Sequence, residues 1–110
     1  MAASWTVDAT ADKRRGNTEI APNLYMVTGT VTPGGDATVT MDFTASKTNL
    51  EVLASKIVHF QMHNTEAVSE GAQYVKNKTG AGAAAEGKVG ILASADATNN
   101  TFEYMCIYQA

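Results

Sequence analysis

The sequence lacks several features that common functional classes require. It has a single cysteine, Cys106, so no disulfide can form within the chain. No apolar run approaches the roughly 20 residues that a membrane-spanning helix needs. The opening residues, Met1 to Trp5, have neither the charged region nor the apolar stretch of a secretory signal. We therefore expect that the protein is made in a cytoplasm and does not associate with a membrane.

Positive charge is also scarce. The formal net charge of the 110 residues is −3, and charged residues make up only 17% of the chain. Nucleic-acid-binding proteins usually carry a basic patch or stripe. The only dense basic run here is Lys13-Arg14-Arg15, which is typical of a solvated loop or of a contact to an acidic partner. The charge balance therefore predicts no nucleic-acid partner.

Catalytic and metal-binding patterns are missing as well. His59 and His63 are the only histidines, and four residues along a strand separate them by roughly 13 Å. That is too far for two ligands of one metal ion, whose bonds are about 2 Å long. The chain has no phosphate-binding loop, no nucleophile elbow and no zinc-binding spacing. We expect no enzymatic activity, no cofactor and no metal.

What the sequence does contain is a recurring period of two. Apolar and polar residues alternate in short runs separated by turn residues, a pattern that predicts strands with one buried face. About seven such strands in a chain of this size favour a single all-β domain, either a β-sandwich or a small barrel, over residues 1–110. The expected strands cover residues 4–10, 25–32, 37–44, 57–63, 72–78, 88–93 and 101–108. Their order in the sheets does not follow from spacing.

Three connections have distinctive sequences. Pro33-Gly34-Gly35-Asp36 predicts a turn that joins its two flanking strands as a hairpin. Thr48-Asn49-Leu50-Glu51 resembles a capping box, and Leu50, Leu53 and Ile57 follow at helical spacing, so one or two helical turns are expected. Residues 79–87 are rich in glycine and alanine and predict a loop without large side chains.

Six short motifs occur in order along the chain: Trp5-Thr6-Val7, Lys13-Arg14-Arg15, residues 27–32, Gly34-Gly35-Asp36, residues 50–57 and Thr101-Phe102-Glu103-Tyr104. Together they resemble the motifs of a family of small β-rich virion proteins of tailed bacteriophages. Residues 16–23 and 79–87 depart from the family pattern, as an insertion and as an unusually Ala/Gly-rich stretch.

The resemblance implies a capsid decoration or cement protein on the virion surface. Such a protein binds across neighbouring subunits of the major capsid protein, and a homotrimer would gain from several contacts acting together. The expected capsid contacts are Met1, Ala2, Ala3 and Ser4 of an extended N-terminal arm, with Lys13, Arg14 and Arg15 in the following loop. The expected oligomer interface contains Phe102, Tyr104 and Tyr108 of an apolar strand. The alternatives are a tail, head-fibre or host-adhesion component, or a β binding module outside any virion.

Overall fold

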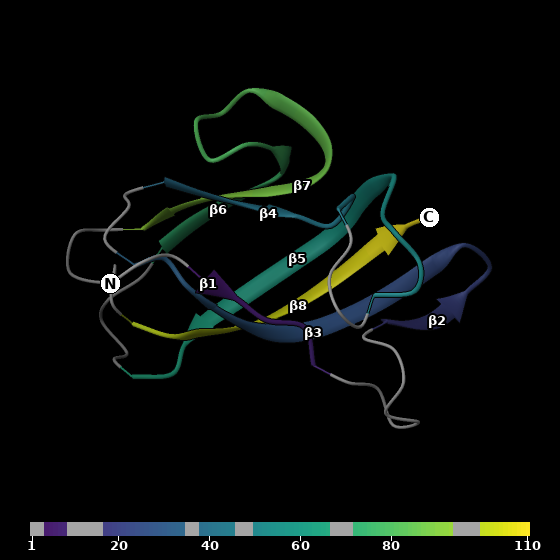
Figure 1. The fold of residues 1–110 in the computed structure, drawn as a ribbon, viewed down its shortest axis with the longest axis horizontal. Coiled ribbons are helices and arrows are strands. Elements are labelled where there is room, and N and C mark those ends of the chain that lie inside the picture. The colour runs from purple at the N-terminus through teal and green to yellow at the C-terminus, as the bar shows by residue number, and fades with distance from the viewer. Residues whose placement is uncertain (1–3, 9–16, 35–37, 46–49, 67–71, 94–99) are drawn as a thin grey trace.

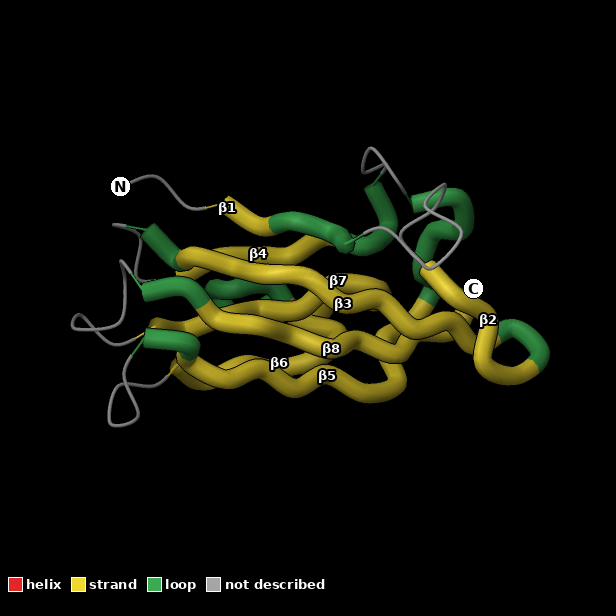
Figure 2. The backbone as a smooth tube through the Cα atoms, turned by 90° about the horizontal axis from the view of Figure 1, so that it is seen from below, coloured by secondary structure: helices red, strands yellow, loops and turns green. Residues whose placement is uncertain are grey.

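The protein is an all-β sandwich, as the alternating pattern predicted. The computed structural model describes residues 4–8, 17–34, 38–45, 50–66, 72–93 and 100–110, and these residues form antiparallel strands without a helix. Two sheets pack face to face, and the strands run roughly along the long axis of the molecule (Figures 1 and 2). The strands are β1 (Ser4–Trp5), β2 (Asn17–Ala21), β3 (Leu24–Thr32), β4 (Thr38–Asp42), β5 (Lys56–Asn64), β6 (Ala72–Lys78), β7 (Ala84–Ala93) and β8 (Phe102–Gln109).

The large sheet contains five strands, in the order β1-β3-β8-β5, with β2 also paired to β3. Strand β8 is central and pairs with β3 over its whole length, so that Cys106 lies opposite Val27. β1 and β2 share the other edge of β3: Trp5 pairs with Val31 at one end, and Asn17 pairs with Val27 farther along. Strand β5 forms the opposite edge of the sheet.

The small sheet contains three strands, in the order β4-β7-β6. Strand β7 begins in an arch that stands out from the sheet before it runs between its two neighbours (Figure 1). The turn that precedes β7 folds back over the sheet, and the N–H of Gly80 donates to the Thr40 hydroxyl at 2.9 Å. In this strand order β7 is central, and β4 and β6 are the two edges of the sheet.

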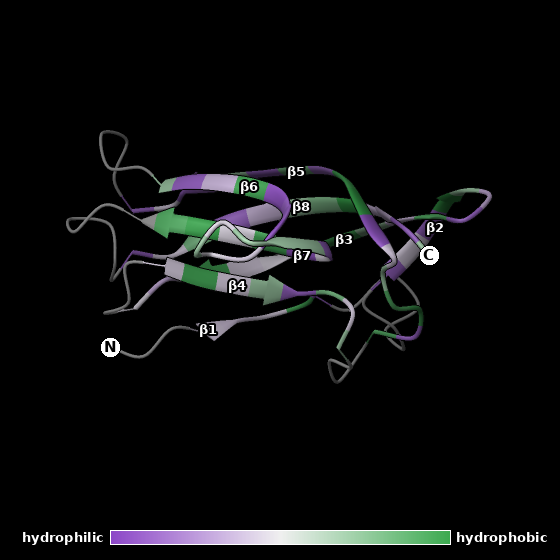
Figure 3. Cartoon of the chain, turned by 90° about the horizontal axis from the view of Figure 1, so that it is seen from above, coloured by the Kyte–Doolittle hydropathy of each residue, from purple (hydrophilic) through white to green (hydrophobic). Residues whose placement is uncertain are grey.

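The core fills the space between the sheets with alternate residues of each strand. The colouring in Figure 3 shows this alternation as bands of hydrophobic and hydrophilic residues along the strands. Aromatic rings dominate the interior: Phe43 lies 6.0 Å from Tyr104 and 6.2 Å from Tyr108 between ring centroids. Burial of such rings supplies much of the hydrophobic stabilisation. The buried set is Val27, Val31, Met41, Phe43, Leu50, Ala54, Ile57, Phe60, Val89, Ile91, Phe102, Tyr104, Cys106 and Tyr108.

The predicted hairpin of residues 25–32 and 37–44 is wrong. Strand β3 belongs to the large sheet, whereas β4 belongs to the small sheet and pairs with β7. Both edges of β3 are already occupied, by β8 on one side and by β1 and β2 on the other. The chain therefore crosses between the sheets after β3, and β4 faces β3 across the core.

Other local predictions also need correction. The described part of the expected helical turn, residues 50–55, contains bends and no helix, and Leu53 is exposed; Thr48 and Asn49 lie outside the described residues. The expected loop 79–87 is shorter, because β7 already begins at Ala84. Residues 17–21, which lie outside the expected strands, form β2.

Candidate functional site

The N-terminal segment, residues 4–8, lies along the edge of the large sheet. Beyond the two residues of β1, the N–H groups of Thr6 and Asp8 donate to the carbonyls of Thr30 and Thr28, each at 2.8 Å. The hydroxyls of Thr6 and Thr30 are also 2.8 Å apart. The segment is therefore held by a ladder longer than the strand itself.

Aromatic side chains fix the same segment from the core side. The Trp5 ring lies 4.9 Å from the ring of Phe43, the residue that directly follows β4 of the opposite sheet. The buried Tyr104 hydroxyl donates to the Thr6 carbonyl at 2.7 Å, and burial raises the pKa of this phenol well above its usual range. Gly29 makes this approach possible, because a Cβ there would lie 2.1 Å from the Thr6 oxygen. Ser4 therefore directly precedes two residues, Trp5 and Thr6, that are fixed by contacts with the core.

Most of the predicted capsid contacts lie outside the described residues. These are Met1, Ala2 and Ala3 of the arm and Lys13, Arg14 and Arg15 of the following loop. Ser4 is described: it pairs with Thr32 in β1, and its side chain is exposed. The structure therefore places only the last residue of the predicted arm, at the start of an edge strand.

The aromatic residues proposed for an oligomer interface lie inside the sandwich. Phe102, Tyr104 and Tyr108 are 1%, 4% and 0% exposed in the single chain. The Tyr108 hydroxyl donates to the Val52 carbonyl, and its ring stacks against Tyr25. Because these side chains are already buried within one chain, they leave no surface for a second copy. The sequence pattern of β8 indicated burial correctly, but burial within the chain and burial between chains have the same pattern.

The histidines occupy the outer surface of β5. His59 Nε2 is 3.4 Å from Gln61 Oε1, and His63 Nε2 is 3.3 Å from Glu103 Oε1, and the His63 and Glu103 side chains are largely exposed. Across the described residues, no three His, Cys, Asp or Glu side chains gather closely enough to bind a metal ion. Likewise, the described residues contain no helix with the length and apolar character of a membrane span.

A hollow of about 290 Å³ lies beside the N-terminal segment. Its polar rim combines Asp8 with residues of three neighbouring strands, and the Thr28 hydroxyl donates to Asp8 Oδ2 at 3.3 Å. The residues that line it are Asp8, Thr28, Gly29, Gln61, His63, Glu103, Tyr104 and Met105. Such a shallow polar surface suits hydrogen bonding to another protein better than enclosure of a small ligand.

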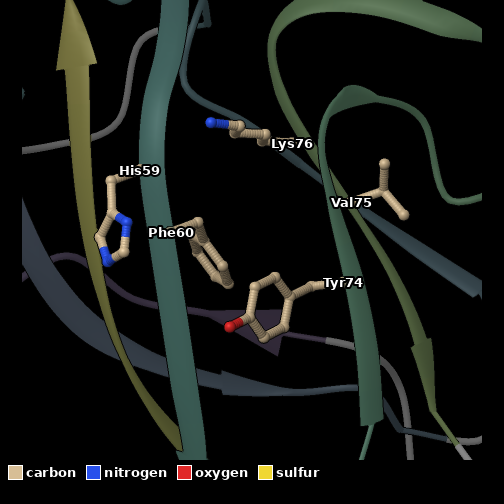
Figure 4. A pocket seen from close by; sticks show the side chains of 5 residues that line it. All are labelled: His59, Phe60, Tyr74, Val75 and Lys76. Carbon is tan, nitrogen blue, oxygen red and sulfur yellow. The ribbon is translucent and has the colours of Figure 1, made fainter.

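A second hollow, of about 320 Å³, opens between the edge strands β5 and β6. We call it the β5–β6 cleft; it is lined by His59, Phe60, Tyr74, Val75 and Lys76. Figure 4 shows Phe60 and Tyr74 pointing toward one another across the gap, and their rings are 5.1 Å apart. Sequence reasoning missed this site because its two walls belong to different sheets.

No known protein family, curated protein or solved structure matches the chain.

Proposed function

We propose that this chain is a structural protein of a tailed-bacteriophage virion, specifically a capsid decoration protein that binds across neighbouring major capsid subunits. It acts by binding and assembly, without catalysis or a cofactor. The proposal starts from the resemblance of its sequence motifs to small virion proteins. The structural observation that supports it is the anchored N-terminal edge.

The N-terminal edge has the properties that a docking arm requires. An arm transmits force to the domain only if the residues that follow it are fixed, and here Trp5 and Thr6 are held by rings, backbone pairing and the Tyr104 hydroxyl. Residues 1–3 precede this anchor directly. An arm that adds to an edge of a capsid sheet would gain main-chain hydrogen bonds that need no deep pocket.

The decisive experiment measures the copy number of the protein in purified virions. Quantitative mass spectrometry against the major capsid protein gives the ratio directly. A decoration role predicts a ratio near the stoichiometry of the capsid lattice, about one copy per capsid subunit at full occupancy of a symmetric lattice. A handful of copies per particle would instead assign the protein to the tail or to one vertex, and its absence from virions would refute the proposal.

The arm is tested by removing residues 1–3, which leaves β1 and its Trp5 anchor in place. We expect the truncated protein to keep the unfolding midpoint of the full chain and to lose capsid attachment in a co-sedimentation assay with capsids that lack the protein. The matched control replaces Leu92, an exposed residue on the small sheet, with alanine. Attachment of the truncated protein at full strength would exclude the arm from docking.

The proposed trimer requires a surface other than Phe102, Tyr104 and Tyr108. Native mass spectrometry of the purified chain measures the number of copies directly. A trimer whose contacts lie on the outer faces of the sheets agrees with the proposal. A monomer at micromolar concentration would restrict the proposal to monomeric decoration.

A further inference from the structure

The β5–β6 cleft has an apolar floor of packed aromatic rings. Phe60 is buried and stacks on Tyr104 with ring centroids 5.6 Å apart, and Tyr74 packs against Phe60 in an edge-to-face arrangement. Tyr74 and Val75 are nevertheless each 39% exposed. The cleft is thus a place where aromatic surface remains open to water although the side chains beneath it are fixed.

One end of the cleft is closed by contacts between the sheets. The Asn77 side chain binds both backbone groups of Ile57, at 2.8 Å and 2.9 Å. Beside it, the Lys76 ammonium donates to the Val58 carbonyl at 2.7 Å, where β5 has a bulge. Figure 4 shows the Lys76 side chain at one end of the cleft, above Phe60. These contacts set the width of the cleft before any partner binds.

Three lysines lie at or next to that same end: Lys76 lines the cleft, and Lys56 and Lys78 are chain neighbours of the Ile57–Asn77 contact. Lys76 and Lys78 flank Asn77 on β6, and Lys56 precedes Ile57, the residue that Asn77 holds. None of these lysines forms an ion pair with a described residue. The ion pairs among the described residues join Lys88 to Asp42 and His63 to Glu103.

The neighbouring β7 arch does not neutralise this charge. Glu86 on the arch is exposed, and it too forms no ion pair with these lysines among the described residues. Three lysines that form no ion pair with a described residue are thus close together along the backbone, in a protein whose net charge is −3. The charge therefore favours an acidic occupant.

We propose that the β5–β6 cleft binds an acidic, extended peptide segment of a partner protein. An apolar side chain of that segment packs on Tyr74 and Phe60, and its carboxylates face Lys56, Lys76 and Lys78. An aromatic floor beside lysines that form no ion pair with a described residue provides both the desolvated anchor and the charge complementarity of a small protein-interaction site. The inference concerns the cleft alone and does not depend on a virion role.

The test uses the isotope-labelled full chain and a defined probe, an acetylated and amidated pentapeptide of sequence Glu-Asp-Leu-Asp-Glu. We expect its amide shift changes to concentrate at residues 58–60 and 74–78. Two control peptides separate the contributions: one replaces leucine with glycine and removes the anchor, and the other replaces every acidic residue with lysine. Both should bind at least about tenfold more weakly, because a lost anchor or a reversed charge removes a central contact.

Matched variants of the protein complete the test. Lys78→Gln and Tyr74→Ala should each weaken binding of the acidic peptide by about three- to tenfold, and raising the salt from low to physiological strength should weaken it further. Lys88→Gln removes the same charge on the other side of the small sheet and should change the affinity less than about twofold if the contact is local. Equal weakening by Lys88→Gln, shift changes spread over the whole surface, or no binding at millimolar peptide would overturn the proposal. The amide spectrum of each variant shows directly whether it is folded.

Discussion

The Asn77 side chain forms two hydrogen bonds with the backbone of Ile57: its Oδ1 accepts from the Ile57 N–H at 2.8 Å, and its Nδ2 donates to the Ile57 carbonyl at 2.9 Å. Oδ1 also accepts from the N–H of Gly87 at 3.1 Å. One amide therefore takes the place of a neighbouring strand for β5 and ties the two sheets together at the closed end of the cleft. Asn77 has a φ of 60°, a left-handed conformation that asparagine adopts more readily than most residues.

Replacing Asn77 with glycine should destabilise the fold by about 2–4 kcal/mol. Glycine keeps the left-handed backbone at no steric cost, so the loss reports the three hydrogen bonds, each worth about 0.5–1.5 kcal/mol. Urea denaturation followed by tryptophan fluorescence measures the free energy of unfolding. Gln73→Ala, at an exposed position of the same strand, serves as the control and should change it by less than about 0.5 kcal/mol. A loss below about 1 kcal/mol for Asn77→Gly would mean that water replaces the amide without cost.

The Tyr104 hydroxyl is the second tie, and it acts on the N-terminal segment. Tyr104→Phe leaves the Thr6 carbonyl without this donor and should cost about 1–3 kcal/mol. The effect should be local. The substitution should speed the solvent exchange of the Thr6 and Asp8 amides, which donate to Thr30 and Thr28, more than that of the β8 amides.

Hydrogen exchange followed by NMR measures this prediction residue by residue. Tyr74→Phe is the matched control, because it removes the same hydroxyl from an exposed ring on the small sheet. Unchanged exchange at Thr6 and Asp8 in Tyr104→Phe would show that backbone pairing alone holds the segment.

The strands themselves were largely predictable from the sequence. Alternation located β3, β5 and β8 within one or two residues, because each has one face in the core, and it located β6 although no residue of that strand is fully buried. It could not say which strands are neighbours, since β3 and β4 have the same pattern whether they pair in one sheet or face each other across two. The Pro33 turn specified a reversal of direction, and the occupied edges of β3 decided that the reversal crosses the core.

The candidate sites were less predictable, because they depend on contacts between distant residues. A strict period of two would place Val58 on the same face as Phe60, but a bulge turns Val58 outward and places Ile57 in the core instead. The β5–β6 cleft joins Phe60 to Tyr74 from opposite sheets, and neither residue stands out in its own strand. Phe102, Tyr104 and Tyr108 had the pattern of buried residues, and only the structure assigns that burial to the core of one chain.

Gly90 should be intolerant of any side chain. A Cβ at this position would lie 2.2 Å from the Thr79 carbonyl oxygen and 2.9 Å from the Gly80 nitrogen, because the turn after β6 folds flat over the outer face of the small sheet. Gly90→Ala must displace this backbone, and we expect a loss of about 3 kcal/mol, as in overpacked cores. Chemical denaturation measures the loss, and amide shifts of residues 79–83 report the displaced turn.

The control for Gly90 is its exposed neighbour on the same strand. Leu92→Ala removes surface apolar area without touching the turn, so its effect should stay within about 0.5–1 kcal/mol. Normal stability of Gly90→Ala, with unchanged shifts in the turn, would contradict the close packing of the turn on β7.

High pH should unfold the protein cooperatively, because three ionisable groups are buried side by side on β8. Burial raises the pKa of the Cys106 thiol to about 12, and it raises the pKa values of the Tyr104 and Tyr108 phenols above their usual range. In the unfolded chain these groups have their ordinary pKa values, 9.0 for the thiol and 10.0 for the phenols, so they lose their protons as the pH rises through those values. The folded chain keeps the protons to higher pH. The stabilising effect is therefore complete below about pH 8 and is lost as the pH rises, by about 1.4 kcal/mol per pH unit for each group.

Phenolate absorbance and tryptophan fluorescence, recorded in one titration, should show Tyr104 and Tyr108 ionising together with unfolding. Ionisation of all four tyrosines in a chain that remains folded would disprove this coupling.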